Sequence, residues 1–262
     1  MADRERPFMS IQITNLYGSI AAEIYDIDKP FGALPDTAFY LDRLAGVSGP
    51  ILEPACGSGR TLVPLAQAGH AVSGFDTSPD MLSRAQARCD AAGVTAHLSR
   101  QGFEDFSYDR PFAAIVLPVG SFTLIGDVAV AMGVLKRFHA ALEPGGLLMI
   151  DIQPLSMLSR PIQDRRSWIA PNGDLLTCEG VGTGTDWLRQ TYETRYRYER
   201  WRDHRLVETQ IDPMIQRAWG KTEFELALLQ SGFGEVRVTG GYDRSRGVRQ
   251  SDRVLTFEAT AL

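Results

Sequence analysis

The chain carries two acidic residues at places where a nucleoside-binding fold needs them. An apolar run at residues 51–52 ends at Glu53, and a turn of small residues then leads to Arg60. A second apolar run over residues 71–75 ends at Asp76. In a parallel α/β sheet such a turn directs backbone N–H groups at a ligand, and a carboxylate at the next strand tip can bind two ribose hydroxyls. The pattern therefore predicts a nucleoside site.

Dinucleotide-binding enzymes share both features, but their G-x-G-x-x-G turn needs a third glycine for close packing of helix and strand. Gly57 and Gly59 would require that glycine where Leu62 stands. An acid just before the turn, here Glu53, would also repel a pyrophosphate at the helix N-terminus. A ligand with a sulfonium or an ammonium group suits Glu53 better. A structural alternative stays open, in which Glu53 caps the turn and Asp76 is a turn residue.

Alternating strands and helices must position these residues. The polarity pattern predicts strands near 50–53, 71–75, 94–98, 112–117 and 146–152, and helices near 60–68, 79–92 and 128–142. Ser78 as N-cap and Pro79 at the first helical position mark the start of one helix. Such alternation predicts an α/β fold: a doubly wound, mostly parallel, Rossmann-like sheet with helices on both faces, which binds ligands at the C-terminal edge of its strands.

The pattern changes after residue 152. Residues 191–201 alternate in polarity, and a polar turn at 202–205 leads to a second strand over 206–211, so we expect an antiparallel hairpin. A capping box over 222–225 opens a last helix. Strands near 234–239 and 253–259 would complete a seven-stranded sheet.

Four parts follow from these patterns. We expect an N-terminal helical lid over 1–46, a ligand-binding Rossmann-like core over 47–152, a β-rich insertion over 153–219 that covers the substrate, and a C-terminal completion of the core sheet over 220–262.

Composition narrows the class of protein. The chain has 262 residues, of which 44% are hydrophobic and 23% charged, as in ordinary soluble proteins. Its net charge of −5 argues against a nucleic acid or an anionic membrane as partner. Cys56, Cys89 and Cys178 cannot all pair and show no C-x-x-C spacing, which favours the reducing cytoplasm. No apolar segment follows the charged residues 1–6, and the longest apolar runs have strand length, so we expect neither secretion nor a membrane span.

Three landmarks extend the comparison beyond the glycine turn: residues 17–26 at the front, the segment 74–82, and the sequence LEPGG over 142–146. With them the chain resembles class I S-adenosylmethionine (SAM)-dependent methyltransferases. More narrowly, it is similar to the small-molecule branch that includes glycine and amino-sugar N-methyltransferases. The resemblance extends over residues 17–259 and is specific for the cofactor, whose product is S-adenosylhomocysteine, rather than for the methyl acceptor.

The resemblance implies roles for individual residues. The backbone from Ala55 to Gly59 would follow the methionine part of SAM, Glu53 would face its ammonium group, and Asp76 would bind the ribose hydroxyls. Met81 would pack against adenine, or serve only as helix core. The resemblance also places these residues around the cofactor: Cys56, Gly57, Arg60, Thr77, Leu117 and Phe122.

Two positions depart from the family pattern. The family has glycine where Ala55 stands, a mild change. It often has aspartate after the glycine that is Gly102 here, to accept a hydrogen bond from the adenine amine. This chain has Phe103 and then Glu104. Either Glu104 takes over that role, or the backbone and ring of Phe103 do.

The acceptor site is less well defined. The N-terminal helix could present Tyr17 and Tyr25 to SAM or to the acceptor, or pack both rings on the domain. We expect further acceptor contacts from Ser121, Trp168, Tyr196 and Tyr198. The segment after the fourth strand lacks the N-P-P-Y or D-P-P-Y motif that binds a base amine, which argues against N-methylation of adenine or cytosine in DNA or RNA.

No residue is singled out as a catalytic base. We expect His70 and His139 at the surface, and neither His97 nor His204 is well placed. We expect no metal site. An amine acceptor needs only to be deprotonated, whereas a hydroxyl usually needs a base or a metal, so nitrogen is slightly favoured over oxygen.

Other readings of the chain stay open. The protein could be a catalytically silent SAM-binding sensor or assembly subunit, and an NAD(P)-dependent oxidoreductase ranks third. Monomer and homodimer both stay open. Arg195 and Arg197 favour either an acidic substrate or, more simply, a solvated strand face.

Overall fold

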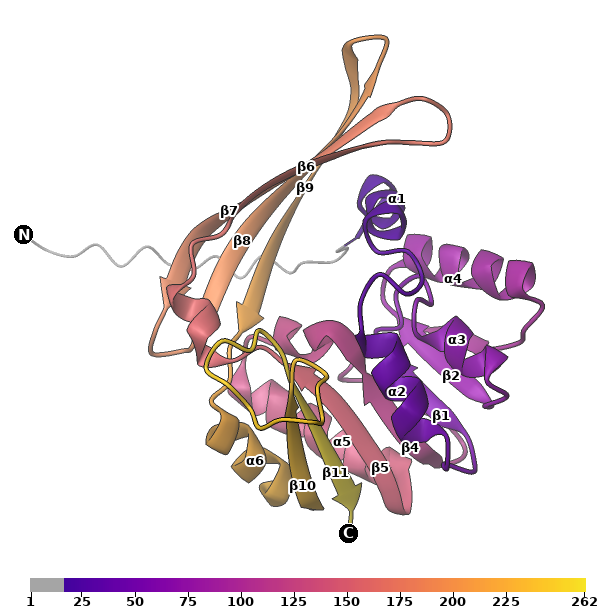
Figure 1. Cartoon of the computed structure of the whole chain (residues 1–262), viewed down its shortest axis with the longest axis vertical. Helices are drawn as coiled ribbons and strands as arrows, with labels where there is room; N and C mark the ends of the chain where they lie inside the picture. Colours follow the sequence, from indigo (N-terminus) through magenta and orange to yellow (C-terminus); the bar gives the residue numbers. More distant parts are fainter. Residues whose placement is uncertain (1–16) are drawn as a thin grey trace, which may run out of the picture.

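A computed structural model describes residues 17–262 as two β-sheets with helices packed around one of them (Figure 1). Residues 1–16 of the expected N-terminal lid lie outside this range. The seven strands of the core sheet are β1 Ile51–Pro54, β2 Val72–Asp76, β3 His97–Arg100, β4 Phe112–Leu117, β5 Leu142–Ile152, β10 Phe233–Gly240 and β11 Leu255–Ala261. Their spatial order is β10-β11-β5-β4-β1-β2-β3.

The core sheet is mostly parallel. Strands β1 to β5 pair in parallel, and only β11 runs antiparallel to both of its neighbours. The strand order reverses between β1 and β4, which opens a crevice at their C-terminal ends. The predicted fold class is confirmed.

Helices cover both faces of the core sheet. The helices are α2 Asp36–Leu44, α3 Leu62–Gln67, α4 Pro79–Ala92, α5 Val128–Ala141 and α6 Lys221–Gln230. Helices α2, α3 and α4 share one apolar core with β1 and β2, and α5 and α6 share another with β4, β5 and β11. Because α2 buries Phe39, Tyr40 and Leu44 against the core sheet, it belongs to this layer rather than to a lid.

Local sequence explains most of the element ends. The Ser78 hydroxyl accepts a hydrogen bond from the Met81 N–H at 3.2 Å, which caps α4 as expected. The N-cap of α6 is Gly220, two residues before the expected N-cap at Thr222, because the Glu223 carboxylate accepts the Gly220 N–H at 3.0 Å. Strand β3 begins at His97, later than the expected 94, where pairing with β2 starts.

The expected β-rich insertion forms a four-stranded antiparallel sheet, which we call the lid sheet. Its strands are β6 Gln163–Ile169, β7 Leu175–Asp186, β8 Thr191–Arg202 and β9 Arg205–Arg217, paired in that order. The predicted hairpin is β8 and β9, joined by Asp203 and His204, which both have positive φ as a tight turn requires. Strand β9 is longer than expected and extends to Arg217.

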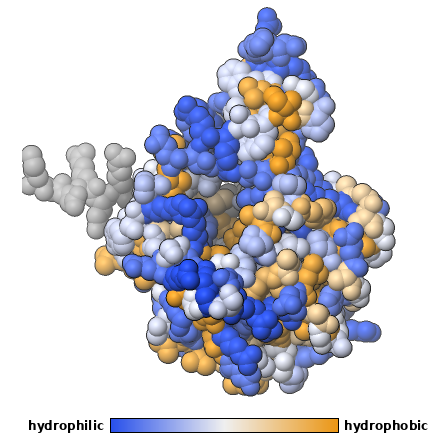
Figure 2. Space-filling view, viewed as in Figure 1, coloured by the Kyte–Doolittle hydropathy of each residue, from blue (hydrophilic) through white to orange (hydrophobic). Residues whose placement is uncertain are grey.

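The lid sheet rises from the core and one end projects freely (Figure 1). In the space-filling view this projecting part carries a hydrophobic area among polar side chains (Figure 2). Ile169, Leu206 and Val207, near the far ends of their strands, are among the exposed hydrophobic residues.

Three short segments complete the fold around the sheets. Helix α1 (Ser19–Asp28) lies beside the lid sheet, and 3-10 turns follow β4 (η1, Pro118–Leu124) and β5 (η2, Leu155–Ser159). Between residues 17 and 262, no helix is both long enough and apolar enough to cross a membrane.

Candidate active site

A cavity of about 400 Å³ lies between the C-terminal edge of the core sheet and the inner face of the lid sheet. The loops after β1, β2 and β3 line one half of it, and we call this the β1–β3 half. The segments after β4 and β5, together with lid residues, line the other half, which we call the β4–β5 half. The crevice predicted at the strand reversal is therefore the place where the two halves meet.

The structure brings many of the sequence-predicted site residues to this cavity. Those that line it are Tyr17, Tyr25, Ala55, Gly57, Asp76, Thr77, Met81, Phe103, Ser121, Tyr196 and Tyr198. Those outside its lining are Glu53, Cys56, Gly59, Arg60, Glu104, Leu117, Phe122 and Trp168.

Asp76 is held by backbone donors at the tip of β2. One carboxylate oxygen accepts the Gly57 N–H at 2.9 Å, and the other accepts the Ser78 N–H at 2.9 Å. Burial raises the pKa of Asp76, and these hydrogen bonds oppose that rise. A Cβ atom added to Gly57 would meet only the Met81 sulfur, at 3.9 Å, so the turn leaves open space in the cavity beside Asp76. These two features fit a ribose and the chain attached to it.

Glu53 lies behind the turn, at the end of β1. Its side chain is buried, and its Oε2 atom has no hydrogen-bond partner in the protein. Burial raises the pKa of Glu53 well above its usual value. A buried carboxylate oxygen without a partner is costly. Glu53 therefore fits a ligand that brings a positive charge or a hydrogen-bond donor, such as the ammonium group of SAM.

Arg60 does not contact the cavity, contrary to the expectation. Its guanidinium forms a buried bidentate ion pair with Asp36 of α2, in which the Nη1–Oδ1 distance is 2.8 Å. The arginine therefore joins the glycine turn to α2.

Packing also removes other expected cofactor residues from the cavity. The Cys56 sulfur points at Gly74 of the neighbouring strand, and Gly59 lies against Ala85 of α4. Leu62, at the third glycine position of a dinucleotide fingerprint, is fully buried and also packs on Gly74. Small residues in this turn thus serve close packing as well as ligand access.

After β3, only one of the two residues that could recognise adenine reaches the cavity. Phe103 lines the cavity, with its ring 6.1 Å from that of Phe75, while Glu104 is exposed and lies outside. Gln101, which sequence analysis missed, lines the cavity directly after β3. Its position just past a strand end could have identified it.

Tyr17 joins the core to the lid sheet beside the cavity. Its N–H donates to Asp212 of β9 at 3.2 Å, and its carbonyl accepts the Ser78 hydroxyl at 2.8 Å. Its ring packs edge-on against Tyr25, with 5.7 Å between centroids. Burial raises the pKa of both hydroxyls, so both stay protonated near neutral pH.

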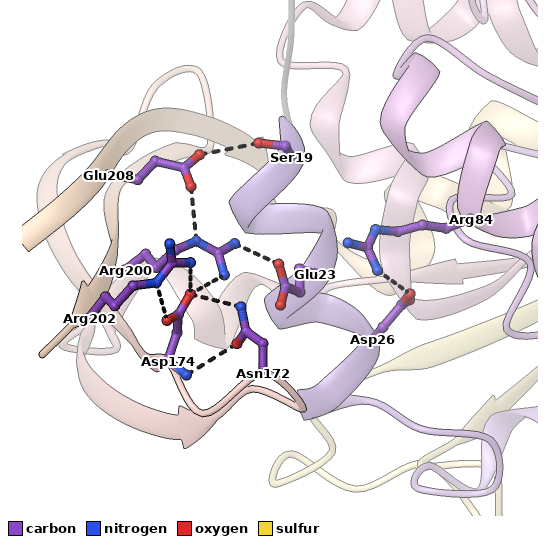
Figure 3. Close-up of polar contacts among 9 residues, drawn as sticks. All are labelled: Ser19, Glu23, Asp26, Arg84, Asn172, Asp174, Arg200, Arg202 and Glu208. Atoms are coloured by element: carbon purple, nitrogen blue, oxygen red, sulfur yellow. Dashed lines mark hydrogen bonds and ion pairs between the residues drawn. The ribbon is translucent and has the colours of Figure 1, made fainter.

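Helix α1 is fixed by charge on two sides (Figure 3). Toward the lid sheet, Glu23 accepts a hydrogen bond from Arg200 at 2.6 Å, and Arg200 also pairs with Asp174 and Glu208. Toward the core, Asp26 pairs with Arg84 of α4 at 3.1 Å. The helix therefore bridges the two sheets along one side of the cavity.

Two charged residues that sequence analysis missed lie at the end of α1. Lys29 lines the cavity with its ammonium 4.4 Å from the centre of the Tyr25 ring, and it joins none of the ion pairs found within residues 17–262. Burial lowers its pKa. Arg166 of β6 also lines the cavity and pairs with Asp28. The expected Trp168 lies outside, where the Arg166 guanidinium stacks on its ring at 5.4 Å.

The β4–β5 half combines hydroxyl, amide and apolar groups. Its lining from the core includes Val119, Gly120, Ser121, Leu124 and Gln153, and from the lid sheet Cys178, Tyr196, Tyr198, Met214 and Gln216. Leu117 and Phe122, which the resemblance placed around the cofactor, are fully buried instead. Phe122 packs against Trp219 and Phe224, because the 3-10 turn directs it into the core. Met214 and Gln216 were missed because they lie on the unpredicted extension of β9.

No histidine lines the cavity, although all four lie within the described residues. His139, expected at the surface, is partly buried, and its ring packs 5.3 Å from that of Phe233. No group of three or more His, Cys, Asp or Glu side chains in residues 17–262 could hold a metal ion.

The fold and this cavity define a class I SAM-dependent methyltransferase, and the comparisons with known proteins agree. Residues 51–146 match the family model described as a methyltransferase domain. The matched residues run from β1 into β5 and include the glycine turn, so this part of the chain is a methyltransferase domain.

Two related sequences and one solved structure illustrate the similarity. A Bacillus subtilis protein, YqeM, named as a methyltransferase without a stated substrate, is 26% identical over 241 residues, which cover 91% of this chain and 94% of YqeM. A dTDP-3-amino-3,6-dideoxy-alpha-D-glucopyranose N,N-dimethyltransferase of Streptomyces fradiae is 29% identical over 141 residues, or 52% of this chain and 54% of that protein. The crystal structure of a SAM-dependent methyltransferase from Clostridium acetobutylicum superimposes with a TM-score of 0.77 at 18% identity. The superposition covers 92% of this chain and 97% of that one, so the two proteins share the fold.

Proposed function

We propose that the protein transfers the methyl group of SAM to a neutral amine nitrogen of a small molecule. SAM supplies a methyl carbon on a positively charged sulfur, and this sulfur leaves with the electron pair of the carbon–sulfur bond when the acceptor lone pair attacks. The protein's task is then to align the two reactants and to exclude water.

The β1–β3 half of the cavity is the proposed cofactor site. There Asp76 binds the ribose hydroxyls, Phe103 and Met81 hold adenine, and Glu53 lies toward the ammonium group. Lys29, whose ammonium joins no ion pair of the described residues, is placed beside Tyr25 to bind the carboxylate of the methionine part. This assignment gives partners to the unpaired Oε2 of Glu53 and to the partly buried charge of Lys29.

The β4–β5 half is the proposed acceptor site, and its chemistry favours an amine. Ser121, Gln153 and Gln216 offer hydrogen bonds, and Tyr196 and Tyr198 offer rings that suit a developing positive charge. No described histidine lines this half to deprotonate a hydroxyl. The nearby carboxylate of Asp28 is engaged by Arg166. This lining of hydroxyl, amide and aromatic groups is the observation that carries the proposal, because an amine that binds in its neutral form needs no base before attack.

A similar Streptomyces fradiae protein acts, by its name, on the nitrogen of an amino sugar, which supports the same class of acceptor. The cavity volume of about 400 Å³ also lies in the range of small-molecule sites.

The test has two stages. Calorimetric titration first compares SAM, S-adenosylhomocysteine and NAD as ligands of the wild-type protein; micromolar binding of the first two alone supports the cofactor site. Matched acceptors, each an amino sugar and its hydroxyl analogue, are then incubated with SAM, and S-adenosylhomocysteine is quantified by mass spectrometry. Turnover with the amine alone supports the proposal. Turnover with the hydroxyl alone refutes the choice of nitrogen, and SAM binding without turnover across a broad panel favours a sensor.

A further inference from the structure

Asp151, at the end of β5, lies completely buried beneath the β4–β5 half of the cavity. One carboxylate oxygen accepts hydrogen bonds from the Tyr40 hydroxyl at 3.0 Å and the Thr256 hydroxyl at 2.6 Å. The other accepts the Val119 N–H at 2.7 Å and the Tyr242 hydroxyl at 2.6 Å. The four donors come from four separate parts of the chain, so Asp151 connects α2, β11 and the segment after β10 to the turn after β4.

No cation compensates this buried carboxylate. No ion pair of the described residues includes Asp151, and the titratable groups that face it are Tyr40 and Tyr242. The Asp36–Arg60 ion pair lies beyond these two tyrosines. Burial raises the pKa of Asp151 to about 6, although its four hydrogen bonds oppose the rise. The carboxyl group therefore changes its charge close to the physiological range.

The residue held by Asp151 has an unfavourable backbone conformation. Val119 has a φ of 61° and Gly120 a φ of 77°. Glycine adopts this left-handed region freely, but a β-branched residue does so only when its surroundings enforce it. The hydrogen bond from Val119 to Asp151 is such a constraint, and a bond to a charged acceptor is roughly twice as strong as a neutral one.

This strained pair forms part of the cavity wall. Val119 and Gly120 line the β4–β5 half directly, and Ser121 and Leu124 of the same turn line it as well. A rotation of the backbone at Val119 would move all four residues relative to the acceptor.

We propose that Asp151 is a positioning residue: its ionised carboxylate fixes Val119 in the left-handed conformation that shapes the acceptor site. It touches neither cofactor nor acceptor, since it lies outside the cavity lining. The effect on methyl transfer rests on the proposed function, whereas the effect on the turn does not.

Asp151→Asn is the appropriate variant because the site can accept it without an unpaired polar group. The oxygen that faces Tyr40 and Thr256 meets only hydroxyls, which can accept as well as donate. An amide nitrogen on that side can donate to them, while the amide oxygen still accepts the Val119 N–H. The variant therefore keeps the shape of the network and removes its charge. Glu258→Gln is the matched control, because Glu258 is a buried carboxylate on the adjacent strand that pairs with Arg43 and does not contact the turn.

The first arm measures the turn itself by amide hydrogen exchange. We expect amide exchange at residues 119–124 to accelerate about tenfold in Asp151→Asn and to stay unchanged in Glu258→Gln. Each rate is compared with the exchange rate set by global unfolding of the same variant. In the wild-type protein, the protection of the same amides should fall as the pH is lowered through about 6, after correction for intrinsic rates. Equal exchange in the two variants, or wild-type protection independent of pH, overturns the proposal. The wild-type pH series decides the question even if Asp151→Asn fails to fold.

The second arm measures methyl transfer with an amine acceptor found in the screen of amino sugars. We expect Asp151→Asn to lower kcat/KM for the acceptor about tenfold and to keep SAM affinity within twofold. In the wild-type protein, kcat/KM should decline as the pH is lowered through about 6, and Asp151→Asn should lack this decline. Adding Val119→Gly should reduce the effect of Asp151→Asn, since glycine needs no constraint there. An equal effect of Asp151→Asn in both backgrounds argues against action through Val119. If wild-type protein shows no transfer at all, the proposed function fails while the exchange arm still decides the role of Asp151.

Discussion

The two sheets contribute to the same cavity but are stabilised in different ways. At the core edge, functional groups are held by buried hydrogen bonds, such as those from backbone N–H groups to Asp76 and from four donors to Asp151. The lid sheet packs on a buried apolar face of α1, and ion pairs that keep partial contact with water add to this contact and join α1 to the core (Figure 3). Charges in water contribute little to stability and are screened by salt. We therefore expect the β1–β3 half of the cavity to be rigid. We expect the attachment of the lid sheet over the β4–β5 half to depend in part on ionic strength.

The largest effect should come from breaking the buried ion pair that joins the glycine turn to α2. Asp36→Ala leaves the Arg60 guanidinium buried without its partner, and we expect a loss of about 3–5 kcal/mol in the free energy of unfolding, measured by urea denaturation. Asp42→Ala on the same helix is the control, since Asp42 pairs with Arg244 in water. A comparable loss in both variants would remove the distinction between buried and exposed charges.

The second prediction concerns pH. The folded-state pKa of Asp151 is about 6, above its ordinary value of 3.8, so the native state holds this proton more tightly than the unfolded chain. The free energy of unfolding should therefore fall as the pH rises from about 4 to about 6, by at most about 3 kcal/mol, and level off above. The difference in the free energy of unfolding between wild-type protein and Asp151→Asn should change with pH across this range. In Glu258→Gln, the free energy of unfolding should depend on pH as it does in the wild-type protein. The ionised Asp151 carboxylate thus lowers the free energy of unfolding, although it fixes the backbone of Val119.

Asp76→Ala tests the cofactor half. Loss of the carboxylate removes the proposed ribose contacts and two backbone constraints, so SAM affinity should fall at least tenfold, about 1.4 kcal/mol. Calorimetry should find the affinity of Asp90→Ala unchanged, because Asp90 is exposed at the other end of α4. Full SAM affinity in Asp76→Ala would show that the ribose binds elsewhere.

Arg200→Ala tests the attachment of the lid sheet. The arginine pairs with Glu23, Asp174 and Glu208, and Asp174 keeps Arg202 as a partner in its absence. We expect a loss of about 1 kcal/mol in the free energy of unfolding at low salt, smaller at about 1 M salt. A loss that is as large as that of Asp36→Ala and insensitive to salt would mean that the lid sheet is fixed as firmly as the core.

The smallest effect should be that of Arg197→Ala on the outer face of the lid sheet. Arg197 is half-exposed and pairs with Glu179 and Glu199, away from the cavity. Its removal should change stability by less than about 0.5 kcal/mol and leave the acceptor KM unchanged. A raised KM would instead support the alternative in which the arginines of this face bind an acidic substrate.

The sequence determined the core sheet and the backbone part of the proposed cofactor site. Short-range patterns are sufficient there: an apolar run that ends in an acid, a turn of small residues and a helix cap lie within a few positions of one another. Asp76, Gly57 and Ser78 accordingly occupy the predicted places. The lid hairpin was also predictable, because alternation of polarity is a local property of a strand.

Only the tertiary structure decided which side chains meet at the cavity. Arg60 is diverted by Asp36, and Phe122 is turned into the core, although both are close in sequence to the predicted site. Met214 on β9 reaches the cavity from far along the chain, and four distant donors converge on Asp151. The physical reason is that burial, ion pairing and backbone strain depend on neighbours that are remote in sequence, which no local pattern of residues encodes.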